Sequence, residues 1–238
     1  MKNLIKKISI VIPCYNEIGT IEIILKKVEN FLTNYEKEVI IVDDFSSDGT
    51  REFLKKYKFE DINYKILFND KNRGKGFSVK QGIEASTGEL ILIQDADLEY
   101  DPNDFSKIIK IFENYDADVV YGSRFNHSDV ARVLYFKHYL GNKILTLFSN
   151  FLTDLNLTDM ETGVKGFKSS KLKSINLEEN RFGFEPEVTA KLNNIECKFY
   201  EIGISYNGRS YKEGKKITWK DGFSAIRCIL KYNIWKKF

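Results

Sequence analysis

The sequence predicts an α/β fold in which a mostly parallel sheet is flanked by helices. In the first half of the chain, short β-branched and aliphatic runs alternate with amphipathic segments of helix length, a pattern typical of strand–helix–strand crossovers. The polar clusters of this half directly follow those runs. Open α/β sheets bind ligands at the carboxyl ends of their strands, so we expect one crevice to collect these clusters.

The elements can be placed from the apolar pattern. Short apolar runs predict strands at 8–12, 39–42, 64–68, 90–93 and 119–121. Apolar residues at helical spacing predict helices near 21–32, 50–58, 76–86 and 103–115. After residue 125 the alternation weakens, and a helical segment with a broad apolar face is expected at 130–152. Another helix is expected to start near Pro186, because proline is favoured at the first helical position.

Composition limits the function classes. The 238 residues suit one large domain with an extension. A content of 42% hydrophobic and 30% charged residues supports a sizeable packed core and argues against a mostly disordered chain. The formal net charge of +3 gives no case for a nucleic-acid-binding protein, because such domains usually carry a strong basic excess.

The cysteines and the apolar runs bear on location. Three widely spaced cysteines, Cys14, Cys197 and Cys228, fit neither a disulfide framework nor a zinc knuckle, so a reducing cytoplasm is expected. The lysines of 1–7 lead into only a short apolar run, which resembles a first strand more than a signal peptide. No apolar stretch reaches the ~18 residues that a membrane-spanning helix needs without charges inside it.

The strongest local signal is the acidic run Asp95-Ala96-Asp97-Leu98-Glu99, directly after the apolar strand at 90–93. Alternate residues of an extended segment point the same way, so Asp95, Asp97 and Glu99 can present oxygens to one divalent cation. Mg²⁺ and Mn²⁺ prefer oxygen ligands and commonly share them with substrate phosphates. Acidic pairs after strands also cap helices, so the motif alone leaves both roles open.

Three other clusters give this motif its context. They are 13–17 after the first strand, 42–46 at the end of the second, and 72–76 before the third helix. Asp43 or Asp44 can accept hydrogen bonds from a base or a ribose, and the glycines and cations of 73–76 suit a phosphate, although such cations also occur in solvated loops. The absence of a G-x-G-x-x-G after the first strand and of a Walker lysine argues against dehydrogenases and P-loop proteins.

Together these motifs resemble the inverting family 2 glycosyltransferases, which have a GT-A fold, and look most like the dolichyl-phosphate mannosyltransferase and polyprenyl-phosphate glycosyltransferase branch. The resemblance spans roughly 8–220 and rests on Ile10-Val11-Ile12-Pro13, Tyr15-Asn16-Glu17, Val42-Asp43-Asp44, Arg73-Gly74, Asp95-Ala96-Asp97-Leu98, Gly122-Ser123-Arg124-Phe125, Asp159-Met160-Glu161-Thr162-Gly163, Phe182-Gly183-Phe184-Glu185, Arg209, Lys215 and Lys216. It implies a Rossmann-like sheet, and the residues after it predict a C-terminal amphipathic helical and basic extension. The implied division is one catalytic domain at 1–220, with a nucleotide-sugar half at about 1–125 and an acceptor half at 126–220, and a basic tail at 221–238.

The resemblance also implies roles for single residues. A donor linked to GDP or UDP is expected to contact Pro13, Tyr15, Glu17, Asp43, Asp44, Arg73, Gly74, Lys75, Asp95, Ala96 and Lys215. Mg²⁺ or Mn²⁺ is expected at Asp95, Asp97 and Glu99, although many relatives have glutamine in place of Glu99. The segment from Arg209 to Lys216 departs from the R-x-x-G-x-S-K form of the mannosyltransferases, which leaves the donor base and sugar open.

An inverting transfer is a single displacement at the anomeric carbon, and it leaves negative charge on the departing nucleotide diphosphate. The cation, Arg209 and Lys215 or Lys216 are expected to stabilise that charge. The expected catalytic residues are Asp97, Arg124, Asp159, Glu185 and Arg209.

The acceptor decides what else is needed. A lipid monophosphate already offers anionic oxygens at neutral pH, and Arg124 and Arg132 are expected to position it. A sugar hydroxyl instead needs a general base. The candidate bases are Asp159, Glu185 and Glu187, which also suit roles in holding a loop or capping a helix.

Two segments bear on the membrane. Residues 130–152 mix apolar side chains with cations, which suits a helix in a membrane interface and equally a helix pair over the core or a dimer contact. The segment from Tyr206 to Phe238 contains nine cationic and two anionic side chains, so its formal net charge is +7. Because the whole chain carries +3, residues 1–205 carry −4. Cations interleaved with aromatics favour an anionic lipid surface, so we predict peripheral association with the cytoplasmic face of a membrane.

The predicted function is metal-dependent transfer of a sugar from a nucleotide sugar to polyprenyl or dolichyl phosphate. One alternative is transfer to a saccharide hydroxyl in cell-surface polysaccharide assembly. Another is a non-catalytic, nucleotide-binding subunit that recruits partners to a membrane, against which the intact acidic motif argues. A separate membrane subunit stays open as a partner, and a nucleic-acid partner is not expected.

Overall fold

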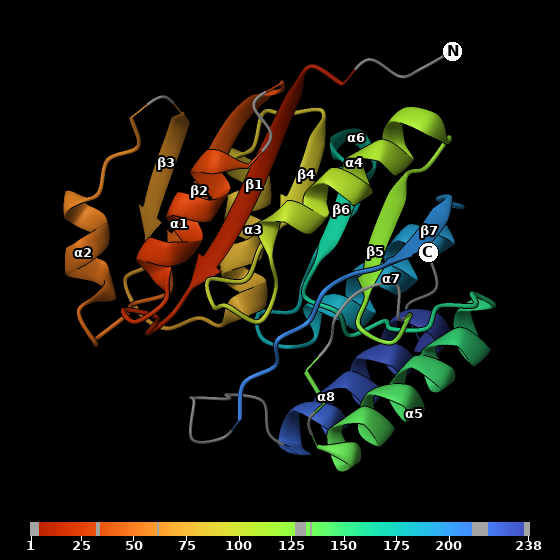
Figure 1. Cartoon of the computed structure of the whole chain (residues 1–238). Helices are drawn as coiled ribbons and strands as arrows, with labels where there is room; N and C mark the ends of the chain where they lie inside the picture. The colour runs from red at the N-terminus through yellow and green to blue at the C-terminus, as the bar shows by residue number, and fades with distance from the viewer. Residues whose placement is uncertain are drawn as a thin grey trace.

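The computed structural model describes residues 5–31, 34–60, 62–126, 132–133, 135–210 and 219–235. Within them, seven strands form one sheet in the order β3-β2-β1-β4-β6-β5-β7 (Figure 1). Strand β6 runs antiparallel to both neighbours, and every other pairing is parallel. The predicted class, α/β with a mostly parallel sheet, is confirmed.

Five strands lie where the apolar runs predict them, and two were not predicted. The strands are β1 Lys7–Cys14, β2 Glu36–Asp43, β3 Asn63–Phe68, β4 Leu90–Ile93, β5 Val119–Ser123, β6 Lys165–Lys168 and β7 Phe199–Gly203. The missed strand β6 reads Lys-Gly-Phe-Lys, and β7 reads Phe-Tyr-Glu-Ile-Gly. Neither carries an apolar run, because charged side chains sit inside both strands. Lys168 and Glu201 are stabilised by partners more than 40 residues away in the sequence, and Lys165 by nearby backbone carbonyls.

The helices fill the intervals between the strands. They are α1 Ile21–Asn30, α2 Thr50–Lys56, α3 Lys75–Ala85, α4 Phe105–Asn114, α5 Phe136–Thr153, α6 Ser169–Leu172, α7 Phe184–Asn194 and α8 Trp219–Leu230. A 3-10 turn, η1 Pro102–Asp104, precedes α4, and a π-helical turn, η3 Lys231–Trp235, extends α8. The four helices predicted in the first half are confirmed. The helix predicted from 130 begins only at Phe136, and α7 begins at Phe184, just before Pro186.

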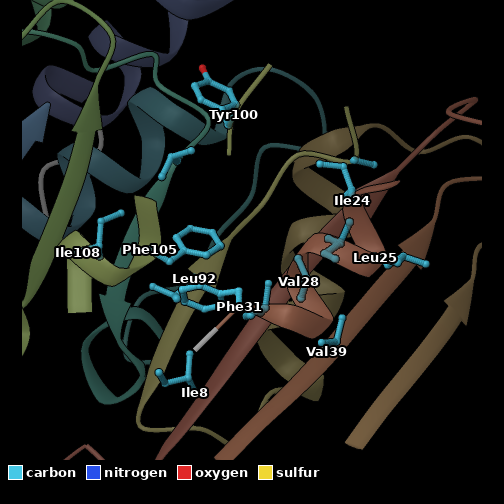
Figure 2. Close-up of a cluster of buried hydrophobic side chains, with 14 of the residues drawn as sticks. Ile8, Ile24, Leu25, Val28, Phe31, Val39, Leu92, Tyr100, Phe105 and Ile108 are labelled. Atoms are coloured by element: carbon cyan, nitrogen blue, oxygen red, sulfur yellow. The ribbon is translucent and has the colours of Figure 1, made fainter. Parts of the chain in front are cut away.

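Two apolar layers enclose the sheet. On one face, Ile8, Ile10 and Ile12 of β1 belong to a cluster shared with α1 and α4, part of which Figure 2 shows. On the other face, Val11 joins a cluster with residues of α3 and α7. Successive side chains of a strand point to opposite faces, and a strand covered on both faces is apolar along most of its length.

Helices α5 and α8 form a pair beyond the carboxyl ends of the strands (Figure 1). Helix α8 and its extension η3 are fastened to the domain by a fully buried face, which includes Cys228, Ile229 and Tyr232. The C-terminal segment is therefore packed onto the domain as far as Asn233, and the predicted boundary at 220 falls inside α8. None of the described helices combines the length and apolarity needed to cross a membrane.

Candidate active site

The loops that follow β1 and β2 are fastened to each other. The Asn16 amide donates to Ser46 Oγ at 2.9 Å, and the Ser47 amide donates to Asn16 Oδ1 at 2.8 Å. Asn16 and Phe45 adopt left-handed backbone conformations, with φ of 51° and 66°. The two strand ends thus form one rigid rim at the carboxyl edge of the sheet, as the sequence predicts.

Asp43 lies at the end of β2 with a fully buried side chain. It accepts a hydrogen bond from Arg51 Nη1 at 3.2 Å. The same guanidinium lies 5.4 Å from the ring centre of Phe45 and 5.1 Å from that of Phe68. Arg51 was not predicted, since nothing in its helical position signals a partner eight residues earlier. The rim therefore presents two half-exposed aromatic rings beside a paired carboxylate.

Asp44 holds the turn that opens α3. Its Oδ1 accepts from the Arg73 amide at 2.9 Å, and its Oδ2 accepts from the Gly74 amide at 2.7 Å. Asn69 Nδ2 also donates to Oδ1, at 2.7 Å. The Arg73 side chain instead pairs with Asp70 at 2.9 Å. Asp44 thus acts on the backbone of the turn, and its predicted direct contact with the donor stays a prediction.

Lys75 links two carboxylates from distant elements. Its Nζ lies 2.8 Å from Asp95 Oδ1, after β4, and 3.1 Å from Glu185 Oε1 of α7. Burial alone disfavours the charged ammonium, but Asp95 and Glu185 outweigh it and raise the pKa of Lys75. Lys75 is therefore a fixed cation directly beside the acidic motif.

Arg209 binds Asp97 and Glu99 of the acidic motif. Its Nη2 donates to Asp97 Oδ2 at 2.6 Å, and its Nη1 lies 3.2 Å from both oxygens of Glu17. The Arg209 amide donates to Glu99 Oε1 at 2.8 Å. One arginine thus contacts three predicted site residues. Glu99, predicted to bind metal, binds Arg209 here, and its role as a metal ligand stays a prediction.

The acidic motif carries an excess of negative charge. Burial, then the neighbouring carboxylates of Asp95 and Glu99, raise the pKa of Asp97, and Arg209 offsets them only in part. The described residues hold no group of three or more His, Cys, Asp or Glu side chains arranged around a metal. Magnesium is commonly bound by one or two carboxylates together with substrate phosphates. Asp95 and Asp97 fit that requirement by their oxygen chemistry and their charge.

Arg124 and Asp159 form a buried, bidentate ion pair. Arg124 Nε and Nη2 donate to the two Asp159 oxygens at 2.6 and 2.7 Å, and the Arg124 amide adds a third bond at 3.0 Å. The guanidinium also lies 5.5 Å from the ring centre of Tyr206. Arg132 reaches the same segment, since its Nη1 donates to the Gly208 carbonyl at 3.1 Å. The two arginines predicted for an acceptor phosphate therefore both border 206–208.

Glu185 and Glu161 are buried carboxyls with spare acceptor capacity. Glu185 Oε2 and Glu161 Oε1 have no hydrogen-bond partner among the residues described. Burial and the charge of Glu185 raise the pKa of Glu161. Nearby, burial lowers the pKa of Lys165, whose Nζ lies 4.4 Å from the ring centre of Tyr121. Lys165 was missed, because it sits in the unpredicted strand β6.

Glu187 has a structural role. The amides of Glu178 and Glu179 donate to its carboxylate at 2.6 and 2.8 Å, and Lys191 Nζ lies 2.7 Å from it. The side chain is fully buried. All of these partners come from its own helix or the preceding loop, so this carboxylate holds a loop, as the alternative interpretation of the candidate bases states.

A sequence profile of the family described as glycosyl transferase family 2 matches residues 9–175. The chain belongs to glycosyl transferase family 2. The dolichol-phosphate mannosyltransferase of Pyrococcus furiosus is 26% identical over 239 residues, covering 97% of this chain and 64% of that protein. The dolichyl-phosphate beta-glucosyltransferase of Dictyostelium discoideum is 29% identical over 256 residues, covering 96% of this chain and 76% of that protein.

A solved structure gives the same picture of the fold. Glucosyl-3-phosphoglycerate synthase from Mycobacterium tuberculosis, in complex with Mn²⁺, uridine diphosphate and phosphoglyceric acid, has a TM-score of 0.73 at 14% identity. The match covers 96% of this chain and 79% of that one. The predicted GT-A fold and the predicted membership of family 2 glycosyltransferases are therefore confirmed.

Three further predicted residues of this family 2 glycosyltransferase lie at or beside the rim, and two lie outside the described part of the chain. Pro13 pairs with Val42 across β1 and β2, and Tyr15 follows β1 with an exposed ring. The Ala96 carbonyl, after β4, accepts from Thr20 Oγ1 at 2.9 Å, which connects the acidic motif to the rim. Lys215 and Lys216 lie outside the described residues. Three cations of the basic C-terminal part are engaged inside the protein: Arg209 at the acidic motif, and Arg227 and Lys231 at Glu179.

Proposed function

We propose that this family 2 glycosyltransferase moves a sugar from a GDP- or UDP-linked donor to a polyprenyl or dolichyl phosphate, with Mg²⁺ or Mn²⁺. The observation that carries this proposal is the meeting of Asp95, Asp97 and Arg209 at the end of β4, where Arg209 lies 2.6 Å from Asp97. Carboxylates suit a divalent cation, and a guanidinium suits a diphosphate. The names of the two relatives, which transfer mannose and glucose to dolichyl phosphate, support the acceptor class.

The donor base is best placed at the rim of β1 and β2. Tyr15, Phe45 and Phe68 are more than one-third exposed there, and their rings offer a base flat surfaces to stack on. Asp43 is the proposed acceptor for a base or ribose donor group, which would have to reach a side chain that is fully buried and paired with Arg51 in this structure. This assignment follows the predicted contacts of Pro13, Tyr15, Glu17 and Asp43.

The diphosphate is best placed between the acidic motif and the opening of α3. Asp95 and Asp97 would hold the cation, which neutralises charge on the leaving diphosphate when bound. Arg209 is now paired with Asp97, Glu17 and Glu99. We propose that its guanidinium leaves these carboxylates and binds the diphosphate when the donor is present. Lys75, 2.8 Å from Asp95 Oδ1, holds the Asp95 carboxylate in its orientation. The presence of Mn²⁺ and uridine diphosphate in the solved complex of the structural neighbour supports a divalent cation and a nucleoside diphosphate as ligands.

The acceptor chemistry needs no general base. A phosphate oxygen of the lipid forms the bond to the anomeric carbon, and the bond from that carbon to the donor diphosphate breaks, with its electrons leaving on the nucleotide diphosphate. Attack from the opposite side inverts the anomeric centre. Arg124 and Arg132, both beside 206–208, provide the positive charge that orients a phosphate dianion.

A saccharide acceptor is the second candidate, favoured by one observation. Glu185 Oε2 is buried and has no hydrogen-bond partner among the described residues, so it is able to accept a proton from a hydroxyl. Lys75 Nζ lies 3.1 Å from the other oxygen, Oε1, and holds this carboxylate in place. The replacement Glu185→Gln separates the two candidates, because only transfer to a hydroxyl depends on that base.

The α5–α8 pair, with the turn η3 that extends α8, is the surface proposed to lie on the lipid. We call the following set the lipid face: Phe136, Leu140, Ile144, Leu147, Phe151, Phe223, Ile226, Ile234 and Trp235, all large and exposed. Phe151 is 82% exposed and Leu147 71%. A monomeric soluble protein rarely exposes so many large apolar side chains on one helix pair, and cations such as Lys137 are interleaved with them, as a lipid interface favours. The cytoplasmic face of a membrane is the proposed location.

The test is a donor panel with product extraction. Purified protein is incubated with Mn²⁺, polyprenyl phosphate and each labelled common GDP- or UDP-sugar, and the organic phase is counted. We expect one donor to give an extractable product that Asp97→Asn does not form. Donor binding without product from any donor would favour the non-catalytic subunit, and product that stays in water with saccharide acceptors would favour the second candidate.

A further inference from the structure

The loop at 178–181 lies directly against the glycine turn that opens α3. A Cβ atom on Gly74 or on Gly76 would lie 2.4 Å from a carbonyl oxygen of this loop. The backbones approach so closely only because both residues are glycines. Because the two backbones are in direct contact, a shift of the loop would also move the turn.

Hydrogen bonds fasten the loop to the same helix. The Phe77 amide, in the first turn of α3, donates to the Asn180 carbonyl at 3.0 Å. Lys80 Nζ donates to Asn180 Oδ1 at 2.7 Å. The loop therefore satisfies an amide that the helix itself leaves open, and it supports the helix end that carries Lys75, the partner of Asp95 at 2.8 Å.

The other side of the loop is bound by α8 and η3. The Glu179 carboxylate accepts from Arg227 Nη2 at 2.5 Å, from Lys231 Nζ at 3.1 Å and from the Tyr232 hydroxyl at 2.9 Å. Tyr232 is fully buried. Burial opposes ionisation of Glu179, but these three donors outweigh it and hold the pKa of Glu179 at about 2. One charged side chain thus joins the loop to three residues of the C-terminal segment.

We propose that Glu179 is a positioning residue of the donor site, which couples α8 to the Gly74–Lys75 turn through the 178–181 loop. The coupling rests on the proposed function only in assigning donor binding to that turn. The same helix carries Phe223 and Ile226 of the lipid face. The loop is therefore a direct mechanical connection between the surface proposed to meet lipid and the turn proposed to meet the donor.

Hydrogen–deuterium exchange of the full chain, without nucleotide or metal, tests the coupling. Glu179→Gln keeps the size of the side chain and removes its charge. We expect the amides of 74–80 to exchange about tenfold faster, because hydrogen bonds to a charged group contribute at least that factor. Glu22→Gln, the same change at an exposed ion pair with Lys26, is the matched control and should leave 74–80 unchanged.

Two further variants test the same connection if Glu179→Gln does not fold. Arg227→Gln and Lys231→Gln cut the same link from α8 and are expected to accelerate the same amides, so they serve if Glu179→Gln does not fold. Unchanged exchange at 74–80, or acceleration spread evenly over the chain, would overturn the proposal. Because no ligand is present, a wrong donor assignment leaves this result standing.

The kinetic counterpart distinguishes positioning from general support. With the donor that the panel identifies, Glu179→Gln is expected to raise the donor KM about tenfold and to leave kcat within about twofold, since the variant weakens donor binding without touching the reacting atoms. A lower kcat at unchanged KM would contradict a positioning role. Failure to find any active donor concerns the proposed function alone, and the exchange experiment still decides the coupling.

Discussion

Arg209 Nη2 lies 2.6 Å from Asp97 Oδ2, and these two residues are 112 positions apart in the sequence. The same side chain contacts Glu17 and Glu99, so a single arginine partly offsets the charge of three carboxylates in this structure. A divalent cation and a guanidinium compete for the same carboxylate oxygens. Cation binding and release of Arg209 from Asp97 are therefore expected to be linked.

Arg209→Gln tests this relationship with opposite effects on two measurements. Loss of the guanidinium leaves Asp97, Glu17 and Glu99 without their counter-charge, so Mn²⁺ binding in the absence of donor should become several-fold tighter by calorimetry. Turnover should fall by about 10²–10³, the usual loss when one charge-stabilising donor is removed. Lys198→Gln, at an exposed pair with Asp116, is the control, and weaker Mn²⁺ binding in Arg209→Gln would contradict the competition.

Asp97→Asn should separate activity from stability. The carboxylate is held in surroundings that raise its pKa, because burial and the charges of Asp95 and Glu99 disfavour its ionised form. Removing that charge should leave the melting temperature unchanged or higher, while transfer in the extraction assay falls below detection. Wild-type rates in this variant would refute the assignment of the acidic motif as the donor and metal site.

The first half of the fold could be predicted because its signals are local. Strands such as β4 are uninterrupted apolar runs, and the acidic motif follows β4 directly, so its place at the sheet edge follows from topology. Strand β6 could not be predicted, since Lys165 is buried there against Tyr121 and two backbone carbonyls. No pattern in the sequence marks a lysine that tertiary contacts allow inside.

The residues that meet at this edge of the sheet could be predicted from the sequence, but the ion pairs and hydrogen bonds among them could not. Spacing after the strands selected Asp95, Asp97 and Lys75, whereas the bonds from Lys75 to Asp95 and to Glu185 depend on chain segments brought together by the fold. Glu187 shows that residue type and sequence position alone can suggest a base where the fold uses the side chain to hold a loop. A carboxylate near the site motif looked able to act as a base, yet backbone amides and Lys191 occupy it.

Asp159→Asn should damage the protein more than a lost base would. The replacement leaves Arg124 buried without its bidentate partner, and breaking a buried pair from one side costs about 3–5 kcal/mol. We expect a clear fall in the midpoint of urea denaturation along with lost activity. Full stability with selective loss of turnover would instead favour Asp159 as a general base.

Glu38 provides a pH test of the fold at the amino edge of the sheet. Burial opposes its ionisation, but hydrogen bonds from Ser9 and Thr87 outweigh it and lower its pKa to about 2. A carboxyl with a depressed folded-state pKa stabilises the protein above its unfolded-state value of 4.5, and that stabilisation is lost as the pH falls toward 2. Glu38→Gln should therefore lower the free energy of unfolding at pH 7 and lower it less at pH 3. An equal gap at both values would show that the charge is not the cause.

The lipid face predicts that the protein binds anionic membranes through the exposed apolar residues of α5. Phe151 and Leu147 are the most exposed pair of large apolar residues near the C-terminal end of α5, at 82% and 71%, and burying each in lipid is worth about 1.5–3 kcal/mol. Replacing both by serine should weaken sedimentation with vesicles of anionic phospholipid at least about tenfold, with the melting temperature retained because neither side chain is packed inside. Tyr115→Ser, an exposed ring outside the lipid face, should bind as the unaltered protein does. Equal binding by all three proteins, or none by any, would remove the α5–α8 pair as the membrane-contacting surface and leave a dimer contact as the explanation for its apolar residues.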